Sequence, residues 1–120
     1  GTGVHNALTL IKETDSTTYK LVTSNCNHIG FWNGNYSTTE GKSIFLTTTE
    51  VRNGNINNIA CAIVHESKHL QYVNNNITVT IHVEEIDCFT YEKKFLLKIP
   101  NVELWLIENA EKEIKRFQGN

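Results

Sequence analysis

The chain has 120 residues, of which 39% are hydrophobic and 20% charged, and its formal net charge at pH 7 is −2. This length suits one domain with its own core, so we expect a single domain spanning residues 1–120. The nearly balanced charge and the apolar content exclude a strongly basic nucleic-acid-binding protein and a disordered chain. No apolar run approaches the about 18 residues that a transmembrane helix needs, so the sequence predicts no membrane span.

The sequence carries no signal for a compartment or for a disulfide framework. The chain contains no methionine and opens with Gly1-Thr2-Gly3, which indicates a processed or trimmed chain. The lack of a signal peptide in it therefore gives no information about the compartment of the protein. Its three cysteines, Cys26, Cys61 and Cys88, are odd in number and lack CxxC spacing. They predict neither disulfides nor a zinc ribbon, and we expect Cys61 and Cys88 to pack within helices.

In chain order, the first half predicts a small, mainly antiparallel sheet. Residues 7–13 and 18–23 read as strand-like runs on either side of residues 14–17, which are typical of a turn, so we expect a hairpin. Residues 29–32 form a further predicted strand, which ends at the strong turn signal Asn33-Gly34.

Residues 43–48 form the last predicted strand and directly precede a helix. A strand in that place could line a substrate cleft and pair with an extended peptide by edge addition. The Asn-rich run at residues 53–58 follows as a loop, and Asn55 or Asn57 is the expected N-cap of the helix that begins there.

The helix predicted over residues 56–73 is apolar almost all round, which is the pattern of a buried helix. It nevertheless carries His65, Glu66 and His69 in the spacing His-Glu-x-x-His. Residues four apart share a helix face, so the two imidazoles can bind one metal ion while Glu66, about 100° away, reaches a water on that ion. Zinc suits nitrogen ligands in a tetrahedral site with one open position, so a third protein ligand is expected elsewhere. The alternatives are hydrogen-bonded core histidines and an exposed polar stripe.

A downstream helix offers the third ligand. Residues 77–83 read as a short extended segment or as the entry to this helix, which ends before Pro100. Glu85 lies in the middle of the apolar helix face, where a carboxylate is costly without a positive partner. It is therefore the expected zinc ligand, with Glu84 and Asp87 as alternatives.

Four further side chains are candidates for supporting roles. Glu92, on the same helix face as Glu85, could orient a ligating histidine. His82 is a rival ligand or a hydrogen-bond donor to the reacting carbonyl, or else a surface histidine. Tyr72 and Tyr91 could steady an oxyanion.

Residues 101–117 predict an amphipathic C-terminal helix with Asn101 as its cap. We expect its apolar stripe to pack on the core, with covering of the cleft as the alternative. The residues of that stripe are Leu104, Trp105, Ile107, Glu111 and Ile114.

Two motifs carry a resemblance to a known family. The run IVHESKHLQ at residues 63–71, followed by EEIDCFTYE at residues 84–92, resembles the gluzincin zinc metallopeptidases. In that family a His-Glu-x-x-His helix is followed by a helix that supplies a glutamate, with a small residue three positions on. Glu85 and Cys88 fit this second pattern, with cysteine in place of the usual alanine. The size of the chain is similar to that of the minigluzincins, which are minimal catalytic cores.

Three positions depart from the pattern of that family. Lys68 is a charge where such helices usually carry an uncharged residue, and Gln71 replaces an apolar one. Phe89 stands where many relatives have an acidic residue that supports a histidine.

Together these patterns predict an α+β, zincin-like domain, in which a small sheet is followed by a metal-binding helix, a glutamate helix and a C-terminal helix. The expected activity is zinc-dependent hydrolysis of a peptide or protein substrate, with His65, His69 and Glu85 on the zinc and Glu66 as general base. A non-catalytic or latent zinc-binding interaction module, and the protease part of a regulator that acts on one partner, are the alternatives. No basic helix-turn-helix is present, so nucleic acid is not an expected partner.

Overall fold

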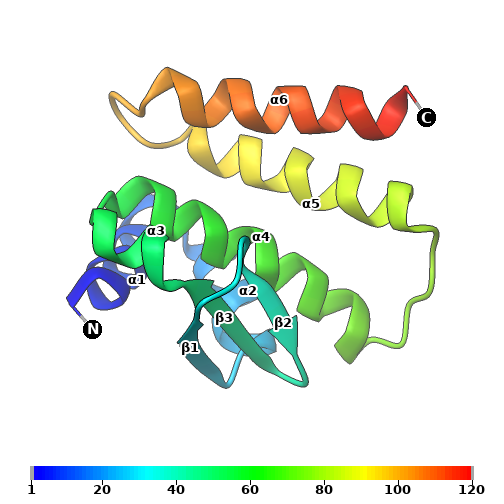
Figure 1. Cartoon of the computed structure of the whole chain (residues 1–120), viewed down its shortest axis with the longest axis horizontal. Coiled ribbons are helices and arrows are strands. Elements are labelled where there is room, and N and C mark those ends of the chain that lie inside the picture. The colour runs from blue at the N-terminus through cyan, green and yellow to red at the C-terminus, as the bar shows by residue number, and fades with distance from the viewer. Residues whose placement is uncertain (1, 120) are drawn as a thin grey trace.

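The computed structural model describes residues 2–119 and has an α+β architecture, as the sequence predicts (Figure 1). A small sheet lies on one side of a long central helix, and a helical hairpin lies on the other. The described elements are α1 (Thr2–Thr14), α2 (Ser16–Asn25), β1 (His28–Trp32), β2 (Thr38–Glu40), β3 (Ser43–Thr47), α3 (Thr48–Asn53), α4 (Ile56–Asn74), α5 (Ile81–Leu96) and α6 (Leu104–Gln118).

The hairpin predicted over residues 7–23 is wrong, because this segment forms the helices α1 and α2. Ala7 and Ile11 lie four apart on α1 and are both fully buried, so the apolar residues follow the helical period. Asp15, in the expected turn, is instead the N-cap of α2, and its carboxylate accepts a hydrogen bond from the Thr17 amide. Packing against α4 therefore outweighs the strand propensity of the threonines and valine in this segment.

The sheet is mixed, with the strand order β1-β3-β2. β1 pairs parallel with β3, and β2 pairs antiparallel with it, so one pair of each kind replaces the expected mainly antiparallel pairing. The strand predicted at residues 43–48 is β3, which is central. The expectation that it adds a peptide at its edge is wrong, because β1 and β2 flank it and are the two edge strands. The turn between β2 and β3 places Gly41 at a φ of 62°, which glycine adopts without strain.

α4 is the central helix, against which α1, α2, α5 and β3 pack. It begins at Asn55, one of the two expected caps, whose side chain accepts a hydrogen bond from the Asn58 amide. Neighbours on several sides explain why this helix is apolar almost all round. Its buried apolar side chains are Ile59, Ala60, Cys61, Ile63, Val64 and Leu70.

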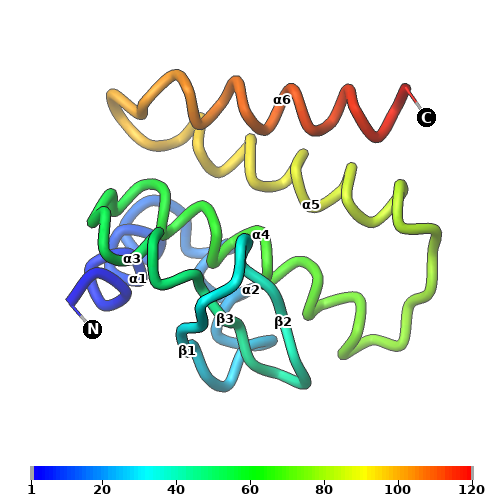
Figure 2. The backbone as a smooth tube through the Cα atoms, viewed as in Figure 1, coloured from blue at the N-terminus to red at the C-terminus, as the bar shows by residue number. Residues whose placement is uncertain are grey.

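The chain leaves α4 through residues 75–80 and then runs back as α5 and forward again as α6 (Figure 2). α5 begins at Ile81, so the end of residues 77–83 is the entry to this helix, and the Thr80 hydroxyl caps it by accepting a hydrogen bond from the Val83 amide. The helix ends at Leu96, before Pro100, as expected.

The start of α6 differs from the prediction. Glu103, not Asn101, occupies the N-cap position, and Asn101 has a positive φ of 57°. The Glu103 carboxylate accepts hydrogen bonds from the side-chain amides of Asn55 and Asn57. These bonds hold the beginning of α6 beside the beginning of α4.

The buried stripe of α6 also differs from the predicted one. Leu106 and Ala110 are buried, whereas Leu104 and Trp105 are 65% and 53% exposed. α6 packs chiefly on α5, so a narrow face suffices. The predicted stripe is therefore wrong at Leu104 and Trp105.

Two observations complete the fold. Within residues 2–119 no helix is both long and apolar enough to cross a bilayer. The three cysteines are free thiols, and Cys61 and Cys88 are buried in α4 and α5, as expected.

Candidate metal centre

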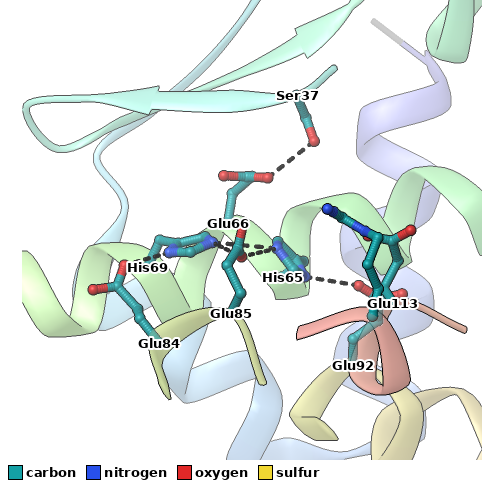
Figure 3. Close-up of polar contacts among 9 residues, drawn as sticks. Ser37, His65, Glu66, His69, Glu84, Glu85, Glu92 and Glu113 are labelled. Carbon is teal, nitrogen blue, oxygen red and sulfur yellow. Dashed lines mark hydrogen bonds and ion pairs between the residues drawn. The ribbon is translucent and has the colours of Figure 1, made fainter. Parts of the chain in front are cut away.

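The candidate site is built on the middle of α4. His65 and His69 lie one turn apart on one face, with their Nε2 atoms 3.2 Å from each other (Figure 3). His65 is only 8% exposed, and its ring packs against the ring of Phe89 with centroids 4.4 Å apart. Burial and the Phe89 ring therefore hold the imidazole of His65 in a fixed orientation.

Glu85 on α5 supplies a third group. Its Oε1 lies 2.8 Å from His69 Nε2 and 3.3 Å from His65 Nε2, and all three donor atoms lie within 4.8 Å of one another. Donors around a tetrahedral ion with bonds of about 2.0–2.1 Å are about 3.3–3.4 Å apart. Two imidazole nitrogens and one carboxylate oxygen at these separations fit an ion such as zinc. His65, His69 and Glu85 thus form a candidate metal site.

Each imidazole contacts a second carboxylate through its other nitrogen. Glu92 Oε1 lies 2.8 Å from His65 Nδ1, and Glu84 Oε2 is hydrogen-bonded to His69 Nδ1 (Figure 3). A carboxylate on Nδ1 fixes the ring and directs Nε2 toward the ion. Glu84, one of the two alternative ligands predicted from the sequence, therefore contacts the far nitrogen of His69, on the side away from the three donor atoms.

The carboxylates alter the ionisation of the histidines before any metal binds. Burial lowers the pKa of His65, but hydrogen bonds to Glu85 and Glu92 outweigh it and raise the pKa to about 10. For the Glu85 carboxyl the directions are reversed: burial raises its pKa, but hydrogen bonds to His65 and His69 outweigh burial and lower the pKa to about 2. A metal ion must therefore displace protons from the imidazoles.

Glu66 lies beside the three donors without being one of them. It is 6% exposed, and its Oε2 accepts a hydrogen bond of 3.0 Å from the Ser37 hydroxyl (Figure 3). Burial raises the pKa of this carboxyl more than His65 and His69 lower it. The Ser37 contact is absent from the sequence predictions, because Ser37 sits in a polar stretch with no helix or strand period.

The donors open onto a cleft of about 760 Å³. Residues 35–39 line it from the sheet side, and α4 and α5 line it around the donors. α6 contributes Asn109, Glu113 and Arg116. The C-terminal helix therefore packs on α5 and also forms a wall of the cleft.

No family model, no curated protein and no solved structure matches this chain. The assignment of the candidate metal site therefore depends on its geometry and on the chemistry of its donors.

The other candidate residues lie outside the cleft lining. His82 is exposed and packs its ring against Phe117, with centroids 5.8 Å apart. The Tyr72 hydroxyl donates a hydrogen bond of 2.7 Å to Asp87, and the Tyr91 hydroxyl lies 3.1 Å from Thr18 Oγ1. Tyr72, Tyr91 and Asp87 are thus engaged in other contacts.

Lys68, a departure from the gluzincin pattern, is accommodated away from the metal donors. Its ammonium lies 3.4 Å from Asp87 Oδ2, donates to the Gln71 side chain and sits 5.1 Å from the centre of the Tyr91 ring. The charge therefore links α4 to α5 instead of entering the cleft.

Removing the Glu92 carboxylate is expected to weaken metal binding. We expect the dissociation constant of Glu92→Ala for zinc to rise by about 10–100-fold, because His65 loses the partner that fixes its orientation. Competition with a chromophoric chelator measures this change. The matched control is Glu108→Ala, at an exposed position of α6. Equal zinc affinity in the two folded variants would contradict the role of Glu92.

Proposed function

We propose that the protein is a zinc-dependent peptidase in which His65, His69 and Glu85 hold the metal and Glu66 is the general base. The observation that supports this most is the position of Glu66. A buried carboxylate that borders the cleft and is held by Ser37, next to three metal donors, suits proton transfer better than coordination.

The chemistry divides between the ion and the chain. A zinc ion held by His65, His69 and Glu85 would supply Lewis acidity, which would polarise a peptide carbonyl and lower the pKa of a bound water. Glu66 accepts a proton from the attacking water and then delivers it to the nitrogen of the leaving amine. A carboxyl whose pKa is raised by burial is suited to both steps, because it can hold the proton between them. Ser37 keeps the carboxylate turned toward the cleft.

The sheet supports a peptide as the substrate. Thr38 and Thr39 of the edge strand β2 line the cleft. The outer edge of such a strand can pair with an extended chain through main-chain hydrogen bonds, which need no particular side chains. The edge-addition mode expected of residues 43–48 is thus better suited to β2.

Hydrolysis of an unfolded protein tests the proposal. Zinc-loaded protein is expected to cleave a casein-like unfolded substrate, to stop when a chelator removes the metal, and to recover when zinc is restored. Stoichiometric zinc without any turnover would contradict a peptidase and favour an interaction module. Cleavage of one folded partner without turnover of unfolded chains would favour the protease part of a regulator.

A further inference from the structure

The cleft at the candidate metal centre has a one-sided charge distribution. Its described lining contains six glutamates but, of lysine and arginine, only Arg116, although the whole chain has 13 acidic and 11 basic residues. The glutamates are Glu50, Glu66, Glu84, Glu85, Glu92 and Glu113. The charge of the chain is therefore almost balanced overall and strongly negative at this cleft.

The positive charge of Arg116 is paired with a carboxylate in the wall of the cleft that α6 forms. Arg116 Nε and Nη2 both donate to Glu113 Oε2, at 3.0 and 2.6 Å. A divalent ion bound at the donors offsets two further negative charges, and the two imidazoles bind such an ion as neutral ligands. The carboxylates still outnumber these positive charges, so the metal-loaded cleft stays negative.

The sheet-side wall adds an aromatic surface. Tyr36 lines the cleft and is 75% exposed. Its backbone is anchored, because the indole of Trp32 donates a hydrogen bond of 3.1 Å to the Tyr36 carbonyl oxygen. A lysine or arginine side chain can lie against such a ring while its charged end faces carboxylates.

We propose that the cleft selects peptides that carry lysine or arginine beside the scissile bond and rejects peptides that carry aspartate or glutamate there. The inference rests on the proposed function, because it names the substrate class of the same site. Charges interact more strongly in a partly enclosed cleft than on an open surface, so several carboxylates acting together discriminate between the two peptide classes. The discrimination is about 10-fold or more at low salt and shrinks as salt screens the charges.

Affinity, not turnover, gives the first test. Two peptides that are identical except for lysines or glutamates around the same central bond are titrated into zinc-loaded Glu66→Gln protein. We expect the lysine peptide to bind at least about 10-fold more tightly at low salt, with a smaller advantage at high salt. Three results would overturn the proposal: equal affinities of the two peptides, a higher affinity for the glutamate peptide through contacts with Arg116, or no binding of either peptide. A lysine preference in binding, without hydrolysis by the wild type, would support the charge selection and contradict the peptidase.

A matched pair of variants locates the effect in the cleft. Glu113→Gln and Glu108→Gln each remove one carboxylate from α6, but only Glu113 belongs to the described cleft lining. We expect Glu113→Gln to reduce the lysine preference by about 2–5-fold and Glu108→Gln to leave it unchanged. An equal reduction of the lysine preference in both variants would show that the net charge of the protein causes the preference. No reduction in either variant would show that the carboxylate of Glu113 in the cleft does not contribute to it. Either result overturns the proposal.

Discussion

Replacing Glu66 by glutamine is expected to lower peptide hydrolysis by about 10²–10⁴-fold while the zinc stays bound and the chain stays folded. Glutamine keeps the shape of the side chain and its hydrogen bond from Ser37, but it cannot accept a proton from the attacking water. The metal donors are unchanged, because Glu66 is not one of the three. The measurement is kcat/KM on a fluorogenic peptide at saturating zinc, with zinc content determined on the same samples.

The control for Glu66→Gln is Glu108→Gln, which makes the same chemical change at an exposed position outside the cleft. We expect it to retain the rate of the wild type. Equal rates for zinc-loaded Glu66→Gln and wild type would contradict the role of Glu66 as general base. A slow Glu66→Gln variant that has also lost its zinc would instead make Glu66 a ligand.

Removing either imidazole is expected to abolish stoichiometric zinc binding. His65→Ala and His69→Ala each remove one of three protein donors, so affinity should fall by more than the about 10–100-fold typical of losing a supporting residue. The surface histidine His82 gives a matched control, because His82→Ala removes the same chemical group outside the cleft lining. Zinc content after desalting separates the three variants.

The same measurement distinguishes the two neighbouring glutamates. Glu85→Ala should lose zinc, whereas Glu84→Ala should retain it with lower affinity, because Glu84 contacts the far nitrogen of His69. Zinc that survives in Glu85→Ala and is lost in Glu84→Ala would exchange the two assignments. Undiminished zinc in His65→Ala would remove the site altogether.

The metal donors are the part of the molecule most open to prediction from sequence. The spacing of His65 and His69 acts within one turn of helix, so no tertiary information is needed to bring the rings together. Glu85 stands out because a carboxylate centred on an apolar helix face needs a positive partner. The structure brings Glu85 to both imidazoles.

The parts that the sequence mispredicts depend on tertiary packing. α1 and α2 contain threonines and branched apolar residues that favour strands. These two segments are nevertheless helical, because their apolar faces are buried against α4. β3 resembles any half-buried strand, and its central place follows only from the pairing of β1 and β2 on its two sides. Ser37 reaches Glu66 across the fold, and no local pattern marks a serine for that contact.

The coordination of the ion in purified wild-type protein tests the metal site most directly. Metal analysis combined with X-ray absorption spectroscopy gives both the identity of the ion and its neighbours. We predict one zinc per chain, with nitrogen and oxygen neighbours at about 2.0–2.2 Å, two of them from imidazoles. Absence of stoichiometric metal, or a sulfur neighbour at about 2.3 Å such as the nearby buried thiol of Cys61 would provide, would contradict a site made by His65, His69 and Glu85.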